Sequence, residues 1–289
     1  MMLKIARAAM FAMVPAEVVL AVLLLSGVAL PRPVLAGAEL VVLAVLLLQA
    51  LVFGQRYHAL RADGTGRRAA LRGAYEQIVP EKVRRIMGFD AKGMVSMVLW
   101  VGRRRHGVPP GAVALSYHRE QTVLMFGFLF ACVIELVAVE ILLRSLDAPV
   151  GLRAVVLALD AYGILIALAV IAGYVTRPHV VTADELRVRY GAFFDLRIPR
   201  RLVTGVQHKR NYNETGMIKV EGECLALAAN SQTNLIVELA EPVVAVRPLG
   251  RREQVRVLRF FADDPSAALD ALRPVRPAAA TGPAARASA

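Results

Sequence analysis

The stretch FLFACVIELVAVEILLR, residues 128–144, is apolar enough to cross a lipid bilayer, yet it contains two carboxylates, Glu135 and Glu140. A membrane-spanning helix needs about 20 mostly apolar residues, and four stretches of the chain meet this condition. The predicted spans cover residues 9–30, 34–54, 122–143 and 152–174. We therefore expect a membrane α-helical bundle of four transmembrane helices, accompanied by a separate folded domain.

The overall composition agrees with a membrane protein, except for its charge. Hydrophobic residues occupy 57% of the 289 positions and the mean hydropathy is +0.52, whereas a soluble domain is about 45–50% apolar. The formal net charge is nevertheless +12. Much of this excess lies in residues 55–120, which hold 13 Lys or Arg against 5 Asp or Glu. The basic residues are thus concentrated in one connection between spans.

The distribution of Lys and Arg also predicts the orientation of the spans. Basic connections tend to stay on the cytoplasmic side, and the links 31–33 and 144–151 are poor in basic residues compared with 55–120. The first apolar run could be a secretory signal, since Lys4 and Arg7 precede it. However, the run is long and a second span follows almost at once. We expect a multi-pass protein of the cell (inner or plasma) membrane, with both termini in the cytoplasm.

These patterns divide the chain into five segments. We expect a transmembrane hairpin at 1–54, a basic cytoplasmic loop at 55–121, a second hairpin at 122–174, a folded domain at 175–273 and a tail at 274–289. The tail is rich in Pro, Ala and Gly without periodicity, which is typical of a disordered segment.

An apolar segment, MVSMVLWV at 94–101, interrupts the basic loop. It is too short to span a bilayer and basic residues flank it, so we predict a helix at 92–105 in the membrane interface, with Trp100 at headgroup depth. A segment buried under the C-terminal domain is the alternative. The arginines expected to face anionic headgroups are Arg84, Arg85, Arg103, Arg104 and Arg105. Nucleic-acid binding is disfavoured because no aromatic residues are interleaved with them.

After the fourth span, apolar and polar residues alternate, which predicts β-strands. In VVTADELRVRYG, residues 180–191, two strands flank a tight Ala-Asp turn, and Leu186, Val188 and Tyr190 share one face. The further predicted strands are 193–199, 202–207, 224–229, 235–240, 243–248 and 255–261. Asp and Pro near the start of 263–273 predict a terminal helix. We expect a small antiparallel sheet or barrel, closed by one helix, that folds independently.

Three stretches of this segment carry a family resemblance. They are DELRVRYG at 184–191, LRIPRRLVTGVQ at 196–207 and RFFADDPSAALDAL at 259–272. In this order they resemble the bacterial pleckstrin-homology-like (PH-like) domains, which are attached to membrane spans in many small bacterial membrane proteins, actinobacterial ones especially. The resemblance covers about a third of the chain. It implies a split-barrel β-sandwich with a C-terminal helix, no catalytic residues, and a role in assembly or interaction.

Every predicted span contains an acidic residue, and three of these residues have a structural explanation. Glu140 lies four residues before Arg144, so the two could form an ion pair within one helix. Glu39 is about 7–8 Å inside the outer end of its span and can reach towards the headgroups. Glu17 follows Pro15, and a helix starting there would place Glu17 in its first turn.

Glu135 and Asp160 are harder to explain. Both are expected about 12 Å below the outer surface on neighbouring antiparallel spans, and we expect no Lys or Arg at that depth. Two ionised carboxylates are costly in a low dielectric, so the pair should be neutral, share a proton or hold a cation. One interpretation is a hydrogen-bonded link between helices, with the Tyr162 hydroxyl nearby. The second is a functional proton or cation site, and the third is that these positions face the lipid or are wrongly assigned to the spans.

The usual catalytic and cofactor signatures are missing from the sequence. There is no phosphate-binding loop, no nucleophile elbow and no Gly-rich dinucleotide turn, and the five histidines show no metal-ligand spacing. Cys132 and Cys224 cannot easily meet. SYHRE at 116–120 groups titratable residues, although an interfacial belt of Tyr, His and Arg also explains it. We therefore assign no catalytic residue and expect no cofactor and no metal.

Two functions remain open. The first is a non-catalytic scaffold, in which the spans present a cytoplasmic PH-like domain as an interaction module. The second is a small intramembrane transporter or enzyme that uses Glu135 and Asp160 as a proton or cation site. The expected partners are the anionic headgroups of the bilayer, contacted by residues 55–120, and a protein bound by the PH-like domain.

Overall fold

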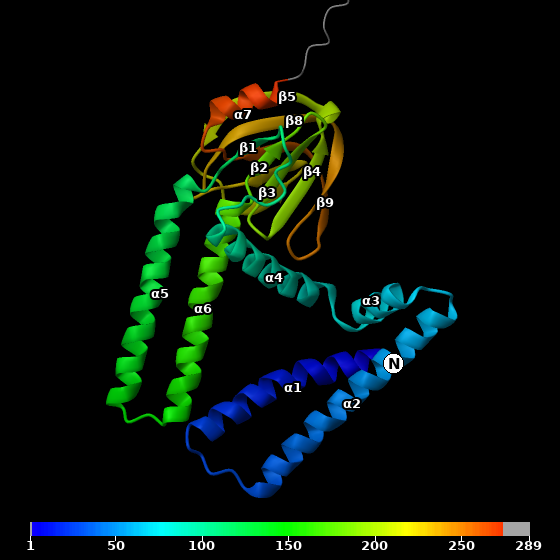
Figure 1. The fold of residues 1–289 in the computed structure, drawn as a ribbon, viewed down its shortest axis with the longest axis vertical. Helices are drawn as coiled ribbons and strands as arrows, with labels where there is room; N and C mark the ends of the chain where they lie inside the picture. The colour runs from blue at the N-terminus through cyan, green and yellow to red at the C-terminus, as the bar shows by residue number, and fades with distance from the viewer. Residues whose placement is uncertain (1, 274–289) are drawn as a thin grey trace, which may run out of the picture. The chain divides into compact units, whose positions relative to one another are not determined.

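The computed structural model describes residues 2–273 of the chain (Figure 1). The chain divides into two compact units. The span unit consists of Met1–Ala91 and Phe126–Ala169, and the sheet unit consists of Lys92–Met125 and Val170–Ala289. Each unit is therefore discontinuous in sequence, and two of the long helices begin or end inside the sheet unit.

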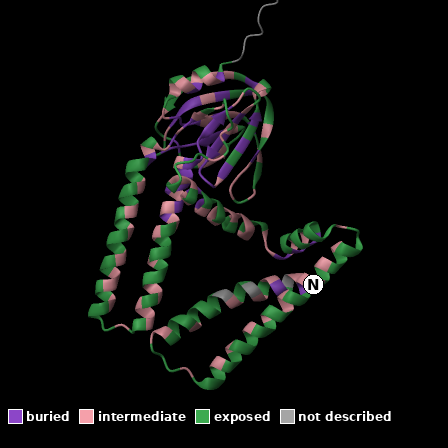
Figure 2. Cartoon of the chain, in the orientation of Figure 1, coloured by how far each residue is buried: buried purple, intermediate pink, exposed green. Residues whose placement is uncertain are grey.

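Four long helices confirm the four predicted spans by length and composition. They are α1 (Met2–Leu25), α2 (Arg32–Ala62), α5 (Arg119–Ser145) and α6 (Val150–Thr176). Most of their side chains are exposed (Figure 2), and Leu40 and Phe130 expose 66% and 67% of their surface. Apolar surface of this extent is favourable only against an apolar solvent such as lipid. The four helices are therefore candidate membrane spans.

The end positions of the first hairpin differ from the prediction. α1 is continuous through Pro15, so Glu17 lies inside the helix and not in a first turn, and the dipole explanation predicted for it is wrong. α2 continues through Gly54, the predicted end, as far as Ala62, because no proline interrupts it and the positive-φ Gly64 that ends it comes only later.

The predicted basic loop is largely helical. Its start belongs to α2, and about half of it is occupied by α3 (Arg67–Ile78) and α4 (Glu81–Val101). The helix predicted at 92–105 thus begins earlier than expected, at Glu81, and also ends earlier, at Val101. It begins early because Pro80 precedes it and Glu81 pairs with Arg85 one turn later, at 2.7 Å.

The sheet unit contains two β-sheets, with a helix after the last strand. The first sheet has the strand order β1-β2-β3-β4, formed by Val113–Leu115, His179–Val181, Glu185–Tyr190 and Phe194–Pro199. A short 3-10 turn, Arg200–Leu202, leads to the second sheet. Its order is β5-β8-β9-β7-β6, formed by Val203–Asn211, Thr233–Val246, Arg252–Phe260, Cys224–Leu227 and Ile218–Glu221. The helix is α7 (Pro265–Leu272), and the Asp264 carboxylate caps it by accepting from the Ala267 N–H at 3.0 Å.

The predicted strands are confirmed in position, but their connections differ from the expected antiparallel pattern. The two segments predicted at 235–240 and 243–248 belong to one strand, β8, with an irregularity between Glu238 and Val243. β7 pairs with β9 in parallel. β1 and β6 were not predicted, because a strand of three or four residues contains too little alternation to recognise.

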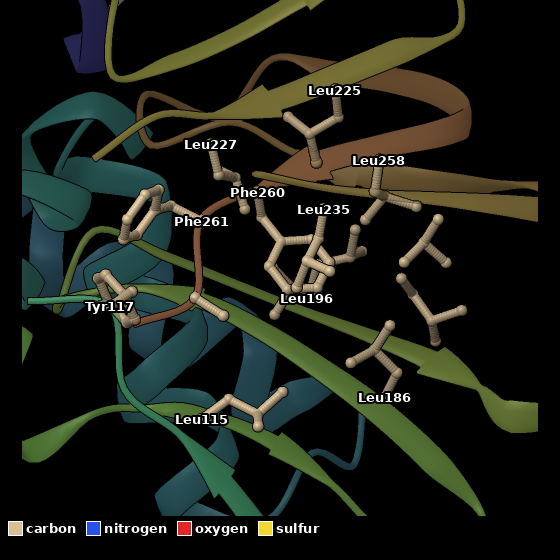
Figure 3. Packing of buried hydrophobic residues seen from close by; sticks show 14 of the residues in the cluster. Leu115, Tyr117, Leu186, Leu196, Leu225, Leu227, Leu235, Leu258, Phe260 and Phe261 are labelled. Carbon is tan, nitrogen blue, oxygen red and sulfur yellow. The ribbon is translucent and has the colours of Figure 1, made fainter. Parts of the chain in front are cut away.

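The core of the sheet unit lies between the two sheets (Figure 3). Leu186 and Val188 on β3 are fully buried, as their alternation predicted, and Tyr190 is almost fully buried. The opposite sheet contributes the larger set of fully buried side chains Leu225, Leu235, Val237, Val255, Leu258 and Phe260. α7 covers one side of this core with Ala268 and Leu272.

The folded domain extends beyond the predicted segment 175–273. β1 pairs with β2 through Leu115 and His179, although β1 comes from the predicted basic loop. Tyr117 and Tyr174 are also members of the core, and they lie next to α5 and inside α6 respectively. The start of α5 and the end of α6 are therefore part of the domain itself and not a linker to it.

Candidate functional site: an arginine-lined cleft

Four aromatic rings join the ends of α5 and α6 to the first sheet. Tyr117 stacks on His179 with the ring centroids 4.4 Å apart, and it also lies 6.1 Å from Tyr190. Tyr174, in the last turn of α6, meets Tyr190 edge to face at 5.1 Å. Rings that contact at these distances add to the stability gained by burial alone. The cluster therefore fixes the helix ends rigidly against the sheet.

Hydrogen bonds satisfy the polar atoms of this aromatic cluster. The Tyr117 hydroxyl accepts from the Gly191 N–H at 2.6 Å, and the Gln121 side-chain amide donates to the Tyr190 hydroxyl at 2.8 Å. Complete burial raises the pKa of Tyr117 above its usual range. The phenols therefore remain neutral, and they have the properties of a structural cluster and not of an acid–base site.

His179 is also a structural residue. Its Nδ1 accepts from the Arg189 N–H at 3.0 Å, and its Nε2 donates to the Phe261 carbonyl at 3.1 Å. Burial lowers its pKa from 6.5 to about 3, and the nearby Arg189 charge acts in the same direction against the effect of the Phe261 bond. The ring is neutral at physiological pH.

Two buried arginines hold the loop that follows α4. Arg189 is 1% exposed and donates to the carbonyls of His106 and Gly107 at 2.7 and 3.0 Å. Arg177, directly after α6, donates to Ser96 Oγ at 2.9 Å and to His106 Nδ1 at 3.3 Å. Burial lowers the pKa of Arg189 to about 10, which still leaves it charged at neutral pH. These contacts fix both sides of the loop.

A third arginine of this region is neutralised by a carboxylate. Arg187 donates two hydrogen bonds to Asp195, at 2.7 and 2.5 Å. Burial raises the pKa of Asp195, but the hydrogen bonds and the charge of Arg187 outweigh this effect, so the pKa is lower than usual. The arginines at 177, 187 and 189 therefore all have defined structural partners.

Next to this loop lies a cleft of about 370 Å³, which we call the arginine cleft. All of its lining residues belong to the sheet unit. They are Trp100, Arg103, Arg104, Arg105, Ser116, His118, Val175, Thr176 and Pro178. The four residues predicted at the membrane surface in this part of the loop, Trp100 and the three arginines, are thus brought together with the end of α6 and the residue before α5.

The backbone of the cleft is defined by the end of α4. The Arg104 N–H donates to the Leu99 carbonyl at 2.8 Å and the Arg103 N–H donates to the Trp100 carbonyl at 3.0 Å, which is a Schellman motif. Arg103 consequently has a positive φ of 52°. Further along, the His106 N–H donates to the Thr176 carbonyl at 2.7 Å. The three arginines therefore lie on a short backbone segment that is anchored at both ends.

Arginine is an unusual residue at the positive-φ position of a Schellman motif. The same hydrogen-bond pattern ends α1, α2 and α5, where the residue with positive φ is Gly27, Gly64 or Asp147. Glycine adopts this conformation without a steric penalty and aspartate tolerates it, whereas a long side chain does not benefit from it. Backbone strain of this kind persists where another requirement favours the residue.

His118 also lines the cleft. Its Nδ1 lies 3.6 Å from Asp263 Oδ2, and the other carboxylate oxygen of Asp263 accepts from the Arg119 N–H at 3.1 Å. Burial lowers the pKa of His118, and this effect outweighs the opposing charge of Asp263. The imidazole is therefore neutral at pH 7, and the positive charge of the cleft comes from its arginines.

The three cleft arginines differ from Arg177, Arg187 and Arg189 of the same unit, whose side chains are paired. The side chains of the cleft arginines are exposed, and within residues 2–273 none of them has a hydrogen bond or an ion pair. By contrast, Arg84 lies 3.8 Å from Glu76 and Arg85 is paired with Glu81, both in the span unit. The predicted membrane-surface arginines therefore form two groups, and only the group at 103–105 lines a cleft and is unpaired.

The structure does not bring the intramembrane acids together as predicted. Glu135 is exposed and Asp160 half-buried, and neither has a hydrogen bond or ion pair within the described part of the chain. The Tyr162 hydroxyl, expected near this pair, donates instead to Asp90 at 2.9 Å. Glu39 is likewise exposed.

Glu140 has a closer partner than the one predicted. The expected ion pair with Arg144 is present at 3.8 Å, but Arg153 of α6 also donates a hydrogen bond to the same carboxylate. Sequence reasoning missed Arg153 because only the turn between α5 and α6 brings the two residues level. No group of three or more His, Cys, Asp or Glu suited to a metal ion occurs among the described residues.

Comparisons with family models, with curated proteins and with solved structures gave no match for this chain. The functional conclusions below therefore depend on the geometry of the molecule.

Proposed function

We propose that this protein is a multi-pass scaffold of the cell membrane that presents a PH-like domain in the cytoplasm as an interaction module. The observation that carries the proposal is the aromatic cluster that joins the ends of α5 and α6 to the first sheet. Tyr174 in α6 and Tyr117 before α5 are 5% and 1% exposed inside the core of the sheet unit. The ends of two candidate spans are consequently part of the folded domain, which suits a module that must display a surface at a bilayer.

The PH-like assignment is part of this proposal. Its support is a four-stranded antiparallel sheet facing a second sheet, closed by a single C-terminal helix, which is the arrangement that the sequence resemblance implies. The cytoplasmic location is supported by the concentration of Lys and Arg in residues 55–120. The lack of a described partner for Glu135 and Asp160 gives no support to the alternative of a proton or cation site.

Cysteine accessibility in intact cells tests the orientation. On a background in which Cys132 and Cys224 are replaced by Ala, Asp63→Cys and Asp270→Cys should be labelled by an impermeant maleimide only after permeabilisation. Leu146→Cys, in the exposed turn after α5, should be labelled from outside. Asp63 is preferable to Gly64 because the φ of Gly64 is +79° and a side chain there would strain the backbone. The reverse labelling pattern would contradict the proposed topology.

The interaction role is tested by photo-crosslinking in the native membrane. Tyr212 and Met217 expose 59% and 61% of their surface on the sheet unit, so both are accessible to a partner of the domain. A photoreactive amino acid at these two positions should give a crosslinked product of defined mass, and the same amino acid at Leu146 should not. Equal crosslinking from all positions, or none from Tyr212 and Met217, would argue against an interaction module.

A further inference from the structure

We propose that the arginine cleft binds a phosphate-bearing anion, and that the occupant is the headgroup of an anionic phospholipid from the surrounding membrane. This inference rests on the proposed function, since it requires that α5 and α6 cross a bilayer. It goes beyond that function by assigning a discrete ligand site to residues outside the PH-like segment.

The charge of the cleft favours an anion. Three consecutive arginines line a space of about 370 Å³, and none of them has a partner among the described residues. A guanidinium group presents a planar set of donors that matches the oxygens of a phosphate and can bind them bidentately. The acidic residue Asp263 lies next to His118. Its carboxylate accepts a hydrogen bond from the Arg119 N–H and faces the His118 imidazole. The cleft thus presents a set of donors suited to a phosphate.

The backbone indicates that one of these arginines is placed for a purpose other than folding. Arg103 occupies the positive-φ position of a Schellman motif, where the corresponding residues of α1 and α2 are glycines. Glycine would satisfy the motif with less strain. An observed outlier of this kind supports a functional role for the side chain.

The position of the cleft favours a lipid over a free phosphate ion. Its wall includes Val175 and Thr176, the last residues of the candidate span α6, and His118, which directly precedes α5. Trp100 lines the same wall, and tryptophan prefers the headgroup level of a bilayer. A lipid can place its phosphate against the arginines and its glycerol region against Trp100 and Val175, whereas a free phosphate gains nothing from the apolar wall.

The single tryptophan of the chain provides a direct readout, because Trp100 lines the cleft. Full-length protein in a neutral detergent is titrated with dihexanoyl phosphatidylglycerol, with dihexanoyl phosphatidylcholine and with inorganic phosphate, while the emission of Trp100 is recorded. We expect a saturable change with the anionic lipid and none with phosphatidylcholine. Inorganic phosphate should act only at much higher concentration.

Each other result of this titration overturns the proposal. An equal response to phosphatidylcholine would show that the cleft does not select charge. Phosphate binding as tightly as the anionic lipid would identify a free anion as the ligand. No response to the anionic lipid would show that no headgroup lies against Trp100.

Substitutions separate the cleft from the general basic charge of the loop. Arg103→Gly, Arg104→Gln and Arg105→Gln should each weaken binding of the anionic lipid roughly fivefold, as expected for one arginine close to an anionic headgroup. Arg103→Gly also relieves the positive φ, so its thermal unfolding midpoint should not fall. A loss of binding in a variant that is at least as stable as the wild type cannot be attributed to misfolding.

The matched control removes the same charge elsewhere in the loop. Arg56, Arg67 and Arg68 are exposed, lie in the span unit and have no described side-chain partner. The triple change of these residues to Gln should leave binding within twofold of the wild type, while the triple cleft variant loses it. Equal losses in both triple variants would mean that diffuse charge attracts the lipid, and the cleft proposal would be wrong.

The two proposals can fail separately. A cleft that binds no lipid, in a protein whose Asp63→Cys and Asp270→Cys variants label as expected, removes only the ligand assignment. Reversed cysteine labelling removes the cytoplasmic scaffold, while the titration in detergent still reports on the cleft.

Discussion

At the scale of single residues, buried charge and exposed charge have opposite roles in this protein. Arg177, Arg187 and Arg189 are each held by carbonyls, a hydroxyl or a carboxylate, and Arg177 and Arg189 hold the loop after α4. The arginines at 103–105 belong to the same loop, and their side chains have no described partner. A buried polar group must be paired to be tolerated, so the unpaired arginines are the ones available to a ligand.

The buried imidazole of His179 predicts that acid destabilises the sheet unit. The pKa of His179 is about 3 in the folded protein and 6.5 in the unfolded chain. The unfolded state therefore binds more protons between these two pH values. The free energy of unfolding should therefore decrease as the pH falls below 6.5, by at most about 1.4 kcal/mol per pH unit, and this contribution should level off near pH 3. Denaturant unfolding of the full chain, followed by circular dichroism at several pH values, measures the slope.

A His179→Phe variant isolates this contribution from other titrating groups. At pH 7 it should be less stable than the wild type, because the Arg189 N–H and the Phe261 carbonyl lose their partner at about 1–3 kcal/mol each. Between pH 6.5 and 4 its stability should decline less steeply. Parallel slopes in the two proteins would show that His179 does not contribute.

At the scale of elements, the hairpin of α5 and α6 depends on one acidic residue more than on the others. Glu140 is bound by Arg153 from the neighbouring helix and lies 3.8 Å from Arg144 of its own helix. Glu135 has no described partner. Polar contacts between membrane helices contribute modestly but measurably to their association, and in this hairpin the contact is near the turn.

We therefore predict a clear order of effects for three substitutions in the hairpin. Arg153→Leu should lower the thermal unfolding midpoint in detergent, because it leaves Glu140 with only its longer contact to Arg144. Arg144→Leu should lower the midpoint less, and Glu135→Gln should leave it unchanged. A Glu135→Gln protein that is destabilised more than the Arg153→Leu protein would support the predicted hydrogen-bonded link between Glu135 and Asp160. A folded Glu135→Gln protein without partner crosslinking would instead favour a protonation role.

At the scale of the whole molecule, the domain is assembled from two separated parts of the chain, one up to the start of α5 and one from the end of α6 onwards. Leu115 and Tyr117 precede α5, Tyr174 ends α6, and the remaining core follows from β2 onwards. The segment 176–273 alone lacks β1 and two of the buried rings. Removing a large buried aromatic side chain typically costs about 3–5 kcal/mol, so the isolated segment loses a substantial part of its core.

Residues 176–273 expressed alone should consequently keep β-structure but bind a hydrophobic dye and unfold more easily than the sheet unit of the full chain. Adding a synthetic peptide of residues 108–120 should reduce dye binding, because it restores β1 and Tyr117. Circular dichroism and dye fluorescence measure both effects. The same peptide with Tyr117→Ala serves as the control, and a fragment that ignores both peptides would indicate that the domain ends near 175, as the sequence suggested.

Several features of this protein follow from the sequence by itself, because they depend on local properties of the chain. Length and apolarity predicted the four candidate spans. Alternation predicted the inward-facing Leu186, Val188 and Tyr190, and the Asp264 cap with its following Pro predicted α7. Each of these signals is contained within one element, where side-chain period or capping chemistry decides the outcome.

Only the tertiary structure decided what depends on contacts between distant segments. β1 is three residues long and is a strand only because β2 pairs with it from far along the chain: Leu115 pairs with His179, 64 positions later, and Ala114 with Val180, 66 positions later. Arg153 meets Glu140 only across a turn. The arginine cleft combines residues 100–105, 116–118 and 175–178, and no local pattern contains all three. Partner choice over such separations is set by the packing of the whole domain, so the basic residues could be recognised in the sequence but not the cleft that they line.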